Sequence, residues 1–133
     1  RSRRVPISVI TLFLLSGFLL VFPQLPATRV AIGAGFFLIG FLLYIPDSLV
    51  SGTAAIDFGT KKGASTAAGV INGFGSIGAI VGGTMPGWIE SIVGEGNDVW
   101  GYVFAGLAGT LFIAAVLLLP KWNALPATAH DDA

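Results

Sequence analysis

The sequence predicts an all-α membrane protein with four transmembrane helices. Of its 133 residues, 54% are hydrophobic and only 11% are charged, and the mean hydropathy is +0.86. A soluble domain carries about 25% charged residues. The apolar residues fall into four runs of 18 to 30 residues, and a helix needs about 20 residues to cross a bilayer. Most of the chain is therefore expected to face lipid or other apolar helices.

The first apolar run covers residues 5–22 and follows a basic cluster that starts at Arg1. Pro6 falls in the first helical turn, where its missing N–H does no harm. A signal peptide also has a basic start and an apolar run. This run is long for a signal peptide, however, and no clean small-residue cleavage site follows it. Because the chain opens inside a basic cluster, we expect it to be a piece of a longer protein.

The second and third runs contain the helix-disturbing residues. The second covers residues 29–50, with Pro46 near its end, and the third covers residues 63–92. The third run is crowded with glycine, and each interior glycine costs a soluble helix roughly 1 kcal/mol relative to alanine. In a membrane, small residues instead let neighbouring helices approach closely. We expect a break or kink in this helix at Pro86.

The fourth run covers residues 100–119, and residues 123–133 form a small, polar tail that is predicted to be disordered. Residues 1–122 are thus expected to form one partial membrane domain. The absence of cysteine excludes a disulfide framework or a thiolate metal site. The formal net charge of zero gives no basic surface for nucleic acid. The single histidine, His130, is interpreted as part of the solvated tail rather than as a metal ligand.

The charges predict an orientation. With four spans, both ends of the chain lie on one side of the membrane. The basic residues expected on that side are Arg1, Arg3, Arg4, Lys61, Lys62 and Lys121. The other side carries Arg29 together with Glu90, Glu95 and Asp98. The positive-inside rule therefore predicts that both termini lie in the cytoplasm. Trp88, Trp100 and Trp122 fall near the predicted interfaces, as expected of an aromatic belt.

Two polar residues near the end of the second span are candidates for a functional site. Asp47 is costly at membrane depth, by roughly 2.5–3.5 kcal/mol at the centre and less near the ends. It either contacts a water-filled pathway, or is hydrated at the interface, or caps a helix broken at Pro46. Tyr44 lies one turn further into the membrane. Its hydroxyl either faces a cavity and donates to an anionic ligand, or belongs to the interfacial belt.

The third span carries a stripe of small and polar residues. Ser65, Gly69, Asn72 and Ser76 recur at i, i+4, i+7 and i+11, which places them on one helix face. Such a stripe either lines a pathway or packs against another helix. Asn72 needs hydrogen-bond partners if it is buried. The structural alternative for Asn72 is an interhelical hydrogen bond, typically worth under ~1 kcal/mol.

Four glycines of the third span form two small-xxx-small pairs, Gly69 with Gly73 and Gly78 with Gly82, and are predicted to pack against other helices. Residues 73–78 match the G-x-G-x-x-G pattern, but no βαβ unit surrounds them, so a dinucleotide site is rejected. The spans hold no nucleophile–base pair, carboxylate dyad or metal-ligand cluster. We therefore expect no enzyme, no metal and no cofactor.

Three motifs give the chain a resemblance to a known family. They are GFLLYIP at residues 40–46, DFGTKKGASTAAG at 57–69 and GFGSIG at 73–78. With them the chain resembles the last third of a major facilitator superfamily transporter. More narrowly, it resembles the organophosphate:phosphate antiporter group, which holds the glycerol-3-phosphate and hexose-phosphate transporters. The resemblance implies helices nine to twelve of a 12-helix transporter, within its C-terminal six-helix half, and alternating access by rocking of the two halves.

The resemblance also implies roles for single residues. Tyr44 matches a substrate-pocket tyrosine in the Y-x-P motif, whereas Ser76 stands where glycerol-3-phosphate transporters have a second pocket tyrosine. Asp47 replaces a residue that is commonly apolar in that group. The phosphate-binding arginines of the family lie in helices one and seven, which this chain does not include.

The expected function is secondary transport of a small, phosphorylated organic anion across the inner or plasma membrane, with inorganic phosphate as a candidate exchange partner. The expected partners are the bilayer and the N-terminal helices of the same transporter. Three alternatives stay open at this point: a non-transporting sugar-phosphate sensor, a transporter for a non-phosphorylated solute, and an independent four-helix structural subunit.

Overall fold

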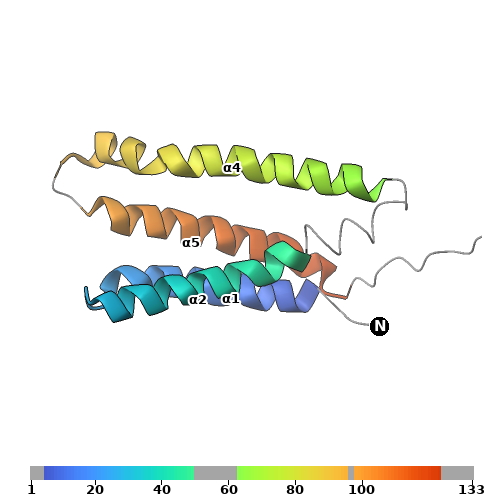
Figure 1. The fold of residues 1–133 in the computed structure, drawn as a ribbon, viewed down its shortest axis with the longest axis horizontal. Coiled ribbons are helices and arrows are strands. Elements are labelled where there is room, and N and C mark those ends of the chain that lie inside the picture. The colour runs from blue at the N-terminus through green and yellow to red at the C-terminus, as the bar shows by residue number, and fades with distance from the viewer. Residues whose placement is uncertain (1–4, 50–62, 96–97, 124–133) are drawn as a thin grey trace, which may run out of the picture.

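Four long helices lie over the four predicted apolar runs. The computed structural model describes residues 5–49, 63–95 and 98–123. Within them the elements are α1 (Val5–Val21), α2 (Arg29–Asp47), α4 (Ala64–Val93) and α5 (Val99–Leu118), with the 3₁₀ turns η1 (Phe22–Gln24) and η3 (Leu119–Lys121) (Figure 1). All four helices are long and apolar enough to cross a membrane. The predicted fold class, an all-α membrane protein, is confirmed for the described residues.

The helices lie side by side with α1 and α5 as the central pair. α1 packs against both α5 and α2, whereas α4 packs on α5, on the side away from α1 and α2 (Figure 1). The buried core lies mainly in the α1–α5 contact, and the residues Leu15, Leu19 and Ala108 form a cluster within it. Side chains of α2 and α5 pack around it: Ile39, Leu42, Phe104 and Leu111. The three-helix unit of α1, α2 and α5 thus holds the core, and α4 lies at its edge.

Local signals in the sequence fix where the helices begin and end. The Thr28 hydroxyl accepts a hydrogen bond from the backbone N–H of Ala31 at 3.2 Å and caps α2. The Asp98 carboxylate accepts one from the N–H of Gly101 at 2.9 Å and caps α5. Gly94 ends α4 with φ of 83°, a conformation that only glycine adopts readily.

Neither internal proline interrupts its helix. α4 is continuous through Pro86, so it is not broken there, and the alternative expectation of a kink stays a prediction. α2 likewise runs through Pro46 to Asp47, which excludes the hypothesis that Asp47 caps a helix broken at that proline. A proline removes its own N–H and crowds the carbonyl four residues before it, and membrane helices tolerate this where neighbouring groups satisfy the freed carbonyl. Close to the two prolines, the Ser48 hydroxyl donates to the carbonyl of Ile45 and the Thr84 hydroxyl to that of Val81, both at 3.0 Å.

Several expectations concern residues outside the described ranges. These are the basic residues 1–4, the loop that carries Lys61 and Lys62, and the tail 124–133 with His130.

Candidate functional site

The two faces of α2 differ in what they contact. Gly35 and Pro46 are buried, and Ile39 and Leu42 pack against the core. The ring of Phe22 fills the space beside Gly35, with its Cδ2 at 2.8 Å from where a Cβ would stand. At 3.6 residues per turn, or about 100° per residue, all four residues lie on one side of the helix. This side is the one that attaches α2 to α1.

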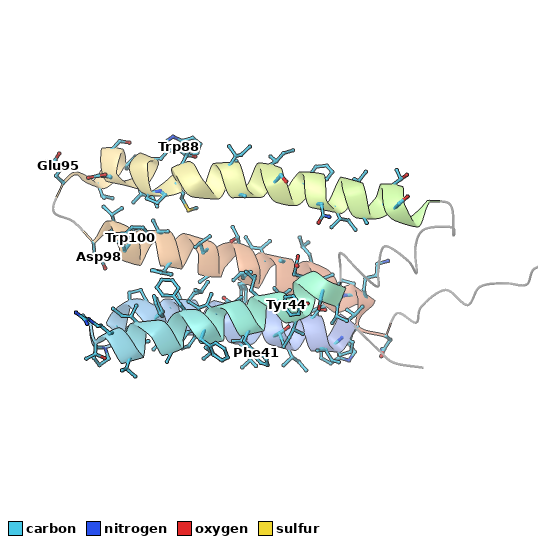
Figure 2. All side chains as sticks on the ribbon, viewed as in Figure 1. Phe41, Tyr44, Trp88, Glu95, Asp98 and Trp100 are labelled. Atoms are coloured by element: carbon cyan, nitrogen blue, oxygen red, sulfur yellow. The ribbon has the colours of Figure 1, made fainter. Side chains whose placement is uncertain are left out.

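Tyr44 lies on the opposite face of α2, about 180° around the helix from Gly35. Its side chain is 70% exposed, among the highest values for a large side chain in this helix. Asp47, the last residue of α2, is also exposed and lies about 60° from Tyr44. Figure 2 shows Tyr44 toward the C-terminal end of α2. The family motif residue thus points away from the three-helix core.

The polar stripe of α4 also avoids the packed interface. The line of α4 that turns toward α5 includes the half-buried residues Ile71, Gly82, Met85 and Ile89. Asn72 and Ser76 lie about 80° and 120° around the helix from Gly82 and are exposed. The Ser76 hydroxyl donates to the carbonyl of Asn72 at 3.0 Å, within the helix itself. Both residues therefore remain accessible to a partner beyond the described residues.

The structure does not bring all four candidate residues together. Tyr44 and Asp47 lie on a helix that packs against α1, whereas Asn72 and Ser76 lie on a helix that packs against α5. Figure 2 shows α5 between α4 and α2. Within the described residues, the candidate site is thus two separate exposed faces.

The four glycines predicted to pack against other helices have open space around them within the described residues. A Cβ at Gly69, Gly73, Gly78 or Gly82 would meet nothing within 4 Å. Instead, Met85 of α4 packs beside a glycine of α5, Gly106. A Cβ added at Gly106 would lie 3.3 Å from the Cε of Met85. The packing role of the four glycines stays a prediction about helices that the described residues do not include.

Sequence reasoning missed a buried polar contact in the core. Ser8, Thr11 and Ser16 of α1 are buried, and the Ser16 hydroxyl donates to the carbonyl of Ala108 in α5 at 2.8 Å. The available signal was the presence of hydroxyl residues within the most apolar run, because polar residues in a membrane helix usually turn toward another helix. This contact fixes α1 against α5 and has no visible connection to the candidate site.

The charged and aromatic residues are divided between the ends of the bundle. Trp88, Glu95, Asp98 and Trp100 lie at the end where α4 leads into α5, far from Tyr44 along the bundle (Figure 2). Lys121 lies in η3, beyond the opposite end of α5. The predicted orientation requires this placement of Glu95 and Asp98 at one end of the bundle and of Lys121 at the other.

Four apolar helices of bilayer-spanning length define the chain as part of an integral, multi-pass membrane protein. Comparison with known proteins then identifies its relatives. The chain is 38% identical over 103 residues to a probable hexose phosphate transport protein of Chlamydia pneumoniae. The matching residues cover 76% of this chain and 21% of that protein. A protein of the same description from Chlamydia trachomatis is 36% identical over 92 residues, with 69% and 19% covered.

A plant protein gives the same result. A putative glycerol-3-phosphate transporter 1 of Arabidopsis thaliana is 34% identical over 89 residues, covering 62% of this chain and 16% of that protein. No family profile matches the chain, and no solved structure matches it. The chain spans about a fifth of the length of the curated relatives.

The predicted resemblance is confirmed: the chain is homologous to the organophosphate transporters. Its relatives are named as transporters rather than enzymes, in agreement with the expectation of no enzyme.

Proposed function

We propose that the protein carrying this chain transports an organophosphate, such as a sugar phosphate or glycerol phosphate, across a membrane by alternating access. The observation that carries the proposal is the homology to proteins named as hexose-phosphate and glycerol-3-phosphate transporters. In such a mechanism two helix bundles rock around a central site that opens to each side in turn. We place the protein in the inner or plasma membrane with both termini in the cytoplasm.

In this proposal Tyr44, Asn72 and Ser76 line the path, and Asp47 lies near its cytoplasmic mouth. The support is their exposure on faces that turn away from the packed contacts of α2 and α4. A tyrosine hydroxyl donates a hydrogen bond to a phosphate oxygen, and a bond to a charged acceptor is worth about 1.5–3 kcal/mol. Asn72 offers both a donor and an acceptor to the substrate or its bound water.

The test is counterflow of labelled glucose 6-phosphate and glycerol 3-phosphate in proteoliposomes that contain the full-length protein. Tyr44→Phe removes the donor alone, so kcat/KM is expected to fall about 10- to 100-fold. Tyr102→Phe is the matched control, because that tyrosine is also exposed, at 56%, but lies on α5 near its N-terminal end. Binding without counterflow would indicate a sensor, and counterflow of glucose but not of its phosphate would indicate a non-phosphorylated solute.

A further inference from the structure

The face of α2 that carries Tyr44 is aromatic in the C-terminal half of the helix. Phe37 lies two turns before Tyr44 and within about 20° of it around the helix. Phe41 lies one turn before Tyr44, about 60° to one side. The side chains of Phe37 and Phe41 are 77% and 56% exposed. Three aromatic rings thus follow one another along the surface that points away from the core.

This aromatic face is not needed to hold α2 in place. The attachment of α2 to α1 uses Gly35, Ile39, Leu42 and Pro46, all about 140–180° from Tyr44. The neighbouring Phe36 has a different role, because its ring contacts that of Phe22 with a centroid distance of 5.0 Å. Phe37 therefore contributes nothing to the described core, unlike the residue beside it.

Glycines leave open space beside the rings. Gly33 and Gly40 lie within about 40° of Tyr44, and a Cβ at either would meet nothing within 4 Å. A donor hydroxyl at one end and apolar rings further along the helix suit a ligand that has an anionic and an organic part. The ring faces of Phe37 and Phe41 offer apolar contact to the carbon skeleton of such a ligand.

We propose that Phe37 is a specificity-determining residue that contacts the organic part of the substrate while Tyr44 binds the phosphate. This rests on the proposed function, since it assigns a second contact on the same path. Two turns of helix separate the residues by about 10 Å, so a hexose phosphate reaches further toward Phe37 than a glycerol phosphate does. Phe37 thus favours the longer substrate.

Single cysteines in the full-length protein, after any cysteines elsewhere have been replaced, test the position of Phe37. The probe is a membrane-impermeant, negatively charged methanethiosulfonate. Phe37→Cys and Tyr44→Cys are expected to react, and glucose 6-phosphate at ten times its dissociation constant is expected to slow both reactions about tenfold. Leu43→Cys is the control, because Leu43 is 47% exposed but lies about 100° from Tyr44. Its reaction is expected to be insensitive to substrate.

Transport by Phe37→Leu tests the specificity. The kcat/KM for glucose 6-phosphate is expected to fall about three- to tenfold, and that for glycerol 3-phosphate to change less than twofold. Substrate protection at Tyr44→Cys without any at Phe37→Cys would overturn the inference and leave the proposed function intact. Equal substrate protection at Leu43→Cys would also overturn the inference, since the protection would then not be confined to the face of α2 that carries Tyr44. A wild-type protein without counterflow of either phosphate would overturn the proposed function and the inference with it.

Discussion

At the scale of single residues, the ring of Phe22 occupies the space beside Gly35. Phe22 is buried at the end of α1 and also contacts the rings of Phe36 and Phe104, each with a centroid distance of 5.0 Å. Its ring lies where a side chain at position 35 would stand. One aromatic residue thereby joins α1, α2 and α5, and the absence of a side chain at position 35 allows it to do so.

Gly35→Ala is therefore expected to destabilise the protein. The added methyl group meets a ring that is itself enclosed by two others, so the change overpacks the contact and costs about 1–3 kcal/mol. Thermal unfolding of the purified full-length protein in detergent measures the effect. Gly17→Ala is the control, because a Cβ at Gly17 meets nothing within 4 Å. Equal melting temperatures for the two variants would contradict the assigned packing.

Ser16→Ala is expected to have a smaller effect. The Ser16 hydroxyl links α1 to the carbonyl of Ala108 at 2.8 Å, and interhelical hydrogen bonds in membranes average about 0.6 kcal/mol with a maximum near 1.7. The same unfolding assay should show a loss in this range. Ser91→Ala is the control, since the Ser91 hydroxyl is exposed and donates to Trp88 within its own helix. A larger loss for Ser91→Ala than for Ser16→Ala would refute the interhelical role.

At the scale of helices, the existence of the four spans was predictable and their contacts were not. Residue type and run length decide whether a segment can cross a bilayer. The runs of α1 and α5 are apolar on most sides, and in α1 the hydroxyl residues Ser8, Thr11 and Ser16 are the signal that marks the packed side. The contact of Phe22 with Gly35 joins residues of different helices and has no local signal. The continuity of α4 at Pro86 had no signal in the sequence, because a proline inside a membrane helix is compatible with a break and with a continuous helix.

The candidate site was predictable only in part. Tyr44 was found through its sequence motif, and its exposure agrees with a role outside the core. Phe37, the further contact that we propose, was not singled out, because it belongs to no motif. Its spacing of seven residues from Tyr44 was a signal that could have found it, and the contact of Phe36 with Phe22 separates it from its neighbour.

The attachment of α4 to α5 gives a prediction at the same scale. A Cβ at Gly106 would lie 3.3 Å from the Cε of Met85, so Gly106→Leu should force the helices apart and cost about 1–3 kcal/mol. Adding Met85→Ala removes the obstructing side chain and should recover at least about half of the lost stability. The stability effects of substitutions at two contacting residues are not additive. Unfolding of the single and double variants measures this coupling. Strictly additive losses would show that the two residues do not meet.

At the scale of the whole molecule, the bundle divides into a core of α1, α2 and α5 and an edge helix, α4. The edge helix carries more glycine than any other helix described, together with the Asn72–Ser76 pair, and its surface is largely open within the described residues. The chain spans about a fifth of the length of its relatives, and in the full-length transporter that we propose, further helices would cover that surface. An open, small-residue surface is unfavourable against lipid alone and suits close helix packing.

The orientation of the bundle gives the last prediction. α5 has 20 residues, about 30 Å at 1.5 Å per residue, which matches the hydrocarbon core. Glu95 and Lys121 lie beyond opposite ends of it, so cysteines at these positions must label from opposite sides of the membrane. Since basic residues stay in the cytoplasm, Glu95→Cys should react with an impermeant maleimide on intact cells, and Lys121→Cys only after permeabilisation. The reverse pattern would invert the proposed orientation, and labelling of both from one side would show that α5 does not span.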